Sequence, residues 1–180
     1  MTDTAVSTTW AIDAAHSSLE FAVKHMVFAT AKGRFAEFSG TIDFDPANVA
    51  ASAVDVEIKV ASISTNQAQR DAHLNSADFF ETDVFPTATF KSTAVSGSPD
   101  KLKIAGDLTI KGVTRAVILD GEFLGQGVNP YGVTVAGFSA TTKVNRAEFG
   151  LTYNAALEAG GVMVGDDIKL SIELELNPAQ

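Results

Sequence analysis

Residues 166–176 read DDIKLSIELEL, and apolar and polar residues alternate through this stretch. Successive side chains of a strand point to opposite faces, so the alternation predicts a β-strand with one buried and one solvent-facing side. The inward residues are Ile168, Leu170, Ile172, Leu174 and Leu176, and the outward residues are Lys169, Ser171, Glu173 and Glu175.

The same period of two recurs along most of the chain. It is clear in residues 38–44 and 54–60, and turn sequences such as DPAN and SGSPD separate the runs. Many strands joined by short turns favour an all-β barrel or sandwich. Further strands are predicted at residues 18–25, 87–95, 102–110, 114–123, 131–145 and 147–158.

Glycines within these runs favour the barrel. Glycine inside a strand often marks a bulge or tight bend, which lets a sheet close on itself. We therefore expect an antiparallel barrel of about eight strands. Residues 64–84 lack alternation and contain the helix formers of NQAQRDAHL, so one short helical segment is expected there. The glycines are Gly40, Gly106, Gly121 and Gly137.

Length and charge limit the organisation and the partners. A chain of 180 residues fits one domain, expected at 10–180 after a flexible N-terminus at 1–9. The net charge is −9, and its 13 Lys and Arg residues are scattered along the sequence. We therefore expect no nucleic-acid binding and no broad adsorption to anionic membranes, which leaves a pocket as the route for lipid contact.

No segment has the character of a targeting or membrane-spanning sequence. The N-terminus MTDTAVSTTW lacks the basic and apolar regions of a secretory signal, so a cytoplasmic protein is expected. The longest charge-free run, 123–142, contains glycines, a proline and hydroxyls and is not an integral membrane segment. There are no cysteines, which removes thiol chemistry.

Two glycine-containing sequences resemble enzyme motifs only in part. GFSAT at 137–141 lacks the second glycine of a nucleophile elbow. GQGVNPYG at 125–132 has Pro130 where a dinucleotide-binding loop needs its third glycine. These two partial matches therefore predict neither a catalytic residue nor a cofactor.

The segment that leaves the strand pattern carries Arg70, Asp71 and His73 ahead of Phe79 and Phe80. One interpretation is a surface ion pair between Arg70 and Asp71, with His73 packed at the helix end. A second is the polar rim of an apolar cavity, because excursions between strands furnish the mouth of a barrel. A third is a metal or hydrolytic site built from the three histidines, His16, His25 and His73.

Inward-facing aromatic residues would line the barrel, and Phe21, Phe38, Phe90 and Phe138 are the candidates. An eight-stranded barrel is either filled by its side chains or just wide enough for one slender ligand. The sequence leaves both open, including a filled barrel that serves as a stress-related interaction protein. Small residues that would leave room inside are Ala22, Gly40, Ala88 and Gly137.

Four blocks of the sequence together resemble the YceI-like, polyisoprenoid-binding family. They are DAAHSSLEFAVKHMVFATAKGRFAEFSGTI, RDAHLNSADFFETDVFPTATFKS, GDLTIKGVTR and KVNRAEFGL. The resemblance implies an extended lipocalin-like barrel, often a homodimer, that binds or carries a long isoprenoid lipid and is not an enzyme. The matched residues include His16, Phe21, His25, Arg70, Asp71, His73, Phe79, Phe90 and Arg146.

Together with Phe38 and Phe138, these matched residues are the predicted ligand-binding set. Within it, Arg70, His73 and His25 are candidates to hold a phosphate or quinone head group, with Asp71 orienting Arg70. The sequence thus predicts binding, transport or sequestration of a polyisoprenoid, quinone or similar amphiphile. The alternatives are the histidine site and the filled barrel described above.

Overall fold

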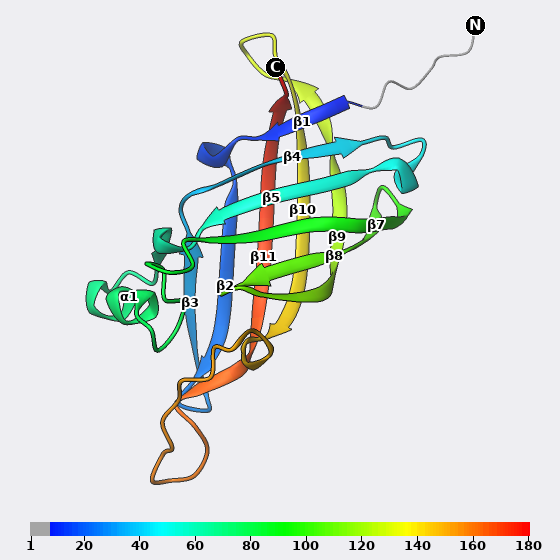
Figure 1. The fold of residues 1–180 in the computed structure, drawn as a ribbon. Coiled ribbons are helices and arrows are strands. Elements are labelled where there is room, and N and C mark those ends of the chain that lie inside the picture. Colours follow the sequence, from blue (N-terminus) through cyan, green and yellow to red (C-terminus); the bar gives the residue numbers. More distant parts are fainter. Residues whose placement is uncertain (1–7) are drawn as a thin grey trace, which may run out of the picture.

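A computed structural model describes residues 8–180 as antiparallel strands wound into a barrel, with a helix on its outside (Figure 1). Residues 1–7, most of the predicted flexible N-terminus, lie outside the described residues, and the first strand begins at Thr8. The strands are β1 Thr8–Ile12, β2 Ser18–His25, β3 Ala29–Phe35, β4 Phe38–Phe44, β5 Ala53–Lys59, β6 Ile63–Ser64, β7 Thr87–Ser98, β8 Lys101–Ile110, β9 Val113–Val128, β10 Thr134–Asn145 and β11 Val164–Pro178.

The predicted closed barrel of about eight strands is confirmed. The order β1-β4-β5-β7-β8-β9-β10-β11 closes through a pairing of β1 with β11, in which Ile12 lies opposite Leu176. Every pairing in this ring is antiparallel. β11, the strand of the DDIKLSIELEL alternation, therefore completes the ring.

The same strand also carries a second sheet segment. β1 pairs with the C-terminal end of β11, whereas β2 pairs with residues 164–173 of it. β3 then pairs with β2, and the short β6 pairs with β3 at Phe35 and Arg34. β2, β3 and β6 thus extend the barrel wall beyond the ring, towards the helix (Figure 1).

Two of the four strand glycines lie at irregularities, as expected. The register of β10 against β9 shifts between Gly137 and Phe138, and Gly106 lies opposite the shift between Ser92 and Ala94. Gly40 has a different role, because a Cβ there would meet the backbone oxygen of Asp55. A side chain at residue 40 would therefore push β4 away from β5.

The predicted helical segment is confirmed as α1, Ala68–Asn75. Gln67 caps it by accepting a hydrogen bond from the backbone N–H of Arg70. Short 3₁₀ helices complete the regular structure: η1 Ala14–His16, η2 Val49–Ala51, η3 Val60–Ser62 and η4 Arg146–Phe149. No helix in residues 8–180 has the length and apolar character needed to cross a bilayer.

The strand predicted at 147–158 was wrong. The Asn145 side chain accepts from Ala147 N at 2.9 Å and starts η4, and Gly150, with φ 77°, ends it. Beyond it the chain is irregular, with one isolated bridge between Ala156 and Val162. Conversely, β3 has no strong strand signal in its sequence, ATAKGRF, and forms because β2 and β6 pair with it.

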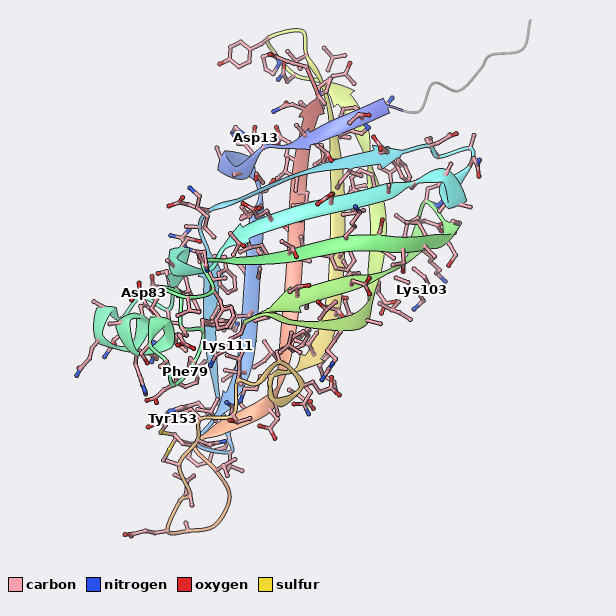
Figure 2. All side chains as sticks on the ribbon, viewed as in Figure 1. Asp13, Phe79, Asp83, Lys103, Lys111 and Tyr153 are labelled. Atoms are coloured by element: carbon pink, nitrogen blue, oxygen red, sulfur yellow. The ribbon has the colours of Figure 1, made fainter. Side chains whose placement is uncertain are left out.

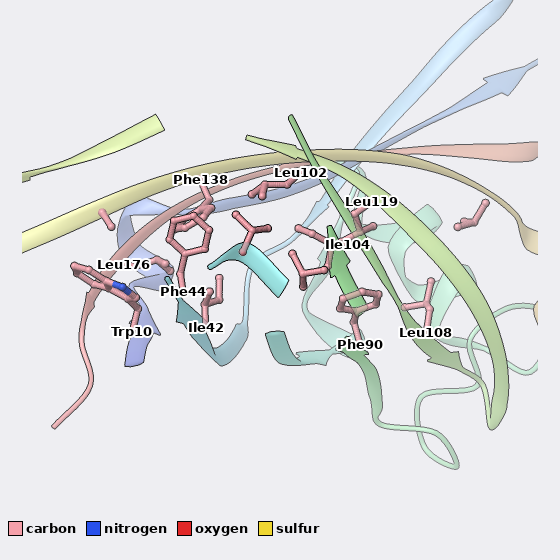
Figure 3. Packing of buried hydrophobic residues seen from close by; sticks show 14 of the residues in the cluster. Trp10, Ile42, Phe44, Phe90, Leu102, Ile104, Leu108, Leu119, Phe138 and Leu176 are labelled. Atoms are coloured by element: carbon pink, nitrogen blue, oxygen red, sulfur yellow. The ribbon is translucent and has the colours of Figure 1, made fainter. Parts of the chain in front are cut away.

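The core lies along the barrel axis (Figure 3). At the end where β1 closes on β11, Trp10 and Leu176 are buried, the latter completely. Beside them, Phe44 and Phe138 meet edge to face, with ring centroids 4.9 Å apart. These aromatic and apolar side chains form the core at this end of the barrel.

Candidate functional site

Two cavities lie end to end along the barrel axis. The ring cavity, of about 110 Å³, is enclosed by the strands of the closed ring, and its wall includes Ile42, Phe44, Phe90, Ile104, Phe138 and Leu174. The helix-side cavity, of about 150 Å³, lies where β2 and β3 face the α1 segment, and its wall includes Val23, Phe35, Ile63, Leu74, Phe79 and Phe80. Together we call them the bore.

Four residues line both cavities and separate them, namely Leu19, Ile58, Leu108 and Leu170. Alternation in the sequence predicted an inward orientation for Leu170 and Ile58, yet it gave no sign that the four residues would meet at one level of the barrel. They come from β2, β5, β8 and β11, and only closure of the sheet brings them together. The two cavities therefore adjoin at these four residues, which we call the constriction.

Polar atoms are scarce along this lining. Ser52 Oγ, in the ring-cavity wall, is buried and has no hydrogen-bond partner within the described part of the chain. A buried hydroxyl without a partner is costly.

The structure places six of the eleven predicted ligand-binding residues in the bore wall. Phe38, Phe90 and Phe138 line the ring cavity, whereas Phe21, Phe79 and Arg146 line the helix-side cavity. Of the small residues expected to leave room inside, Ala88 lines the bore. Ala22 and Gly137 are the strand neighbours of the inward-facing Phe21 and Phe138. They therefore face outward.

The predicted ion pair between Arg70 and Asp71 does not form; both side chains instead bind Thr65. Arg70 donates from Nε to Thr65 Oγ1 at 2.7 Å and from Nη2 to the Thr65 carbonyl at 2.9 Å. Asp71 Oδ1 accepts from Thr65 N at 2.9 Å and from Thr65 Oγ1 at 2.6 Å. The helix face that carries these residues binds the loop before it, so the two residues anchor α1 outside the bore.

His73 packs at the helix end, as one interpretation predicted. Its Nε2 lies 2.8 Å from Asp78 Oδ2, and its ring meets Phe79 and Tyr153 edge to face. Phe79 and Tyr153 lie on this side of the barrel (Figure 2). The apolar residues that follow α1 thus point into the bore, while the charged ones contact neighbouring protein groups.

The three histidines do not form one site. His16 and His25 flank opposite ends of β2, whose eight residues span roughly 25 Å. His73 belongs to α1. The strand's length, which the sequence alone could have indicated, separates His16 from His25.

His16 instead belongs to a surface cluster at the far end of the barrel, beside Asp13 (Figure 2). His16 Nδ1 lies 2.8 Å from Asp13 Oδ2 and 4.0 Å from Glu175 Oε1. The hydrogen bond with Asp13 and the negative charge of both carboxylates raise the pKa of His16 above its ordinary value of 6.5. The same hydrogen bond lowers the pKa of Asp13.

Arg146 is buried and holds the wall of the helix-side cavity together. It donates to the carbonyls of Leu151, Tyr153 and Gly165 at 2.8–2.9 Å. Burial lowers the pKa of this guanidinium, and the charge of Asp166, 3.5 Å away, opposes that effect. Its guanidinium group binds backbone carbonyls, so the rest of the Arg146 side chain faces the cavity.

Comparison with known proteins agrees with this architecture. Residues 10–176 match the model of the YceI-like domain. A UPF0312 protein of Staphylococcus aureus is 41% identical over 171 residues, which cover 94% of this chain and 98% of that protein.

Solved structures show the same fold. The YceI protein of Campylobacter jejuni has a TM-score of 0.75 at 36% identity, covering 87% of this chain and 90% of that one. A polyisoprenoid-binding domain from Saccharophagus degradans has a TM-score of 0.70 at 15% identity, covering 96% and 99%. The family model, the relatives and the barrel geometry agree, and this chain belongs to the YceI-like family.

Proposed function

We propose that this protein binds a long-chain isoprenoid lipid, a polyisoprenoid, quinone or similar amphiphile, inside the bore, and so carries or sequesters it. The observation that carries the proposal is the apolar lining that runs through both cavities. The name of the S. degradans neighbour, a polyisoprenoid-binding domain, supports the same class of ligand.

Hydrophobic transfer supplies enough affinity for such a ligand. Burying one CH₂ group contributes about 0.8 kcal/mol, so about ten groups contribute roughly 8 kcal/mol before entropic losses. Micromolar binding requires a net value of about that size. A ligand longer than ten carbons therefore has affinity to spare, and discrimination between chains that differ by one methylene is weak.

The constriction determines how a long chain fits. A cavity of about 150 Å³ in another protein holds a molecule the size of benzene. Each cavity of the bore is of that order. A long chain therefore occupies both cavities only if the side chains between them, among them Leu108, move aside.

The first experiment identifies the cargo. Native mass spectrometry of gently purified protein, followed by solvent extraction, should reveal a stoichiometric isoprenoid or related long-chain lipid. Protein that is empty and also takes up no isoprenoid alcohol in vitro would refute the proposal and favour a filled barrel.

A second experiment tests the place of binding. Leu108→Trp fills the constriction, and we expect it to retain short isoprenoids and to lose long ones at least about tenfold. Asp107→Trp adds the same side chain to the outer face of β8 and should bind both lengths normally. Equal effects of the two variants would place the ligand outside the bore.

A further inference from the structure

The fold gathers basic residues on one outer face of this acidic protein. Across the sheet, Lys143 lies opposite Lys169, Lys169 opposite Ala22, and Ala22 opposite Lys32. Arg34 follows Lys32 on the same face of β3, and Lys24 follows Ala22 on β2. We call this set the basic face; it holds five of the 13 Lys and Arg residues and comprises Lys24, Lys32, Arg34, Lys143 and Lys169.

Few carboxylates offset these charges. Asp167 lies 3.5 Å from Lys143, and Asp166 lies against Arg146. Glu20 is opposite Arg34. Among the described residues, no carboxylate lies within 4.0 Å of the four other basic groups. The face is therefore locally positive, although the protein as a whole carries −9.

The β2–β3 hairpin, which carries Lys24, Lys32 and Arg34, ends in exposed apolar side chains. Between β2 and β3, Met26, Val27 and Phe28 have 38%, 59% and 85% of their surface exposed. Met26 donates from its backbone N–H to the Met163 carbonyl at 2.8 Å, which joins the turn to the loop that contains Val162, itself 44% exposed. We call Met26, Val27, Phe28 and Val162 the apolar tip. The loop that contains Val162 has one acidic residue, Glu158.

The backbone of the turn is strained. Met26 and Val27 have φ values of 54° and 71°, a region that tight hairpins normally fill with Gly, Asn or Asp. A β-branched residue such as Val27 is disfavoured there. Apolar side chains thus stand where polar turn formers would make the fold more stable, which points to a role other than folding.

The tip continues the helix-side end of the bore. Val23, two residues before His25, lines the helix-side cavity, and so does Val164, which pairs with His25. Figure 1 shows the β2–β3 turn beside the loop before β11, at the end of the barrel opposite the β9–β10 turn. The exposed apolar residues therefore lie where the cavity wall ends.

We propose that the protein docks on an anionic lipid bilayer through this region, with the apolar tip inserted and the basic face against the head groups. A lipid surface fits better than a second copy, because four protruding side chains are few beside the 20–30 residues a side of a standard protein interface. Apolar insertion and basic residues together are the two signals that hold a protein at a membrane. The inference rests on the proposed function, since it places the cavity end of a lipid carrier at the lipid's source.

Vesicle sedimentation tests the docking. Wild-type protein should pellet with phosphatidylcholine vesicles that contain phosphatidylglycerol, much less with pure phosphatidylcholine, and less again at high salt. Phe28→Ser should lower partitioning at least about tenfold. The double variant Lys32→Gln, Lys169→Gln should lower it about 25-fold, because each charge near an anionic surface contributes about fivefold.

Matched controls separate the site from general effects. Tyr131→Ser removes an aromatic side chain that is 90% exposed in the β9–β10 turn, and Lys91→Gln with Lys101→Gln removes two charges from β7 and β8. Both controls should partition like the wild type. No sedimentation of the wild type, or equal losses in controls and test variants, would overturn the inference.

Uptake of farnesol from solution, measured by native mass spectrometry, distinguishes the two proposals. Docking variants that load farnesol normally but do not sediment support the inference. If the wild type loads farnesol and does not sediment, the docking proposal is contradicted and the carrier function is not. A wild type that sediments through the tip without loading supports docking and contradicts the carrier function.

Discussion

At the residue scale, Arg146 shows how a residue can look functional in a pattern and prove structural in the fold. It belongs to a family-like block, and a basic residue beside an apolar bore suggests contact with an anionic head group. In the structure its donors bind carbonyls of the irregular segment after η4 and of β11. The sequence pattern pointed to Arg146, whereas its hydrogen-bond partners became known only from the structure.

Replacing Arg146 by Leu should destabilise the protein by about 3–5 kcal/mol, because the buried or half-buried carbonyls of Leu151, Tyr153 and Gly165 lose their donors. Urea unfolding would show a lower midpoint at an unchanged slope. The control is Arg115→Leu, which removes an exposed arginine of β9 and should change stability by less than about 0.5 kcal/mol. An equal loss of stability in the two variants would show that Arg146 does not hold these segments together.

His16 and Asp13 give stability a dependence on pH. The raised pKa of His16 means that the folded state favours its protonated form, so this contribution is full below pH 6.5 and is lost as the pH rises through the folded-state pKa. The lowered pKa of Asp13 gives a contribution that is present above pH 3.8 and is lost as the pH falls through the folded-state pKa. The His16–Asp13 pair therefore stabilises the folded protein most between about pH 3.8 and pH 6.5.

The stability difference between wild type and His16→Gln should accordingly be larger at pH 5 than at pH 8. NMR titration of the His16 ring should give a pKa above 6.5. Asp13→Asn should bring that pKa back towards 6.5. A His16 titration that is the same in wild type and Asp13→Asn would disprove the coupling.

At the element scale, the α1 segment is a cover over the helix-side cavity. Leu74, Phe79 and Phe80 face inward from it, yet α1 itself has no fully buried residue. Phe80 meets Phe35 of β3 edge to face at 6.1 Å. The segment is not paired into the sheet and is held by side-chain contacts and by Thr65, so we expect its local stability to be lower than that of the paired strands around it.

Asp71→Ala should loosen this cover without unfolding the barrel. The variant leaves the N–H and the hydroxyl of Thr65 without their acceptor, which lowers the local opening free energy by about 1–3 kcal/mol. Hydrogen exchange should accelerate in residues 65–80 and stay unchanged in β8 and β9. Gln69→Ala, on the exposed side of α1, is the control; unchanged exchange in Asp71→Ala would show that Thr65 is not the anchor.

At the scale of the whole molecule, ligand and stability are linked. A ligand that binds only the folded barrel stabilises it by about 2.7 kcal/mol at a concentration of 100 Kd. For a chain of this length that corresponds to a rise of about 5–10 °C in Tm. Delipidated protein should therefore melt lower than protein reloaded with its extracted lipid, and equal Tm values would contradict binding in the bore.

Two predictions from the sequence concern the molecule in its cell and its assembly, and they stay predictions. A homodimer should give twice the chain mass of 18.9 kDa in light scattering, and a single-chain mass would refute it. A cytoplasmic location is tested by cell fractionation.

The sequence by itself determined the kind of structure. Alternation in stretches such as 166–176 indicated strands, glycines indicated curvature, and the break at 64–84 indicated the helix, because each is a local property of neighbouring residues. It also indicated the inward aromatic residues Phe38, Phe90 and Phe138, since side-chain parity follows from alternation.

Only the tertiary structure decided which distant residues meet. Closure of the sheet brought Leu19, Ile58, Leu108 and Leu170 to one level of the bore. It also collected scattered lysines of β2, β3, β10 and β11 into one basic face. Strand register determines which of these residues come into contact. Register arises from the pairing of segments far apart in the chain, and the local sequence carries little information about it.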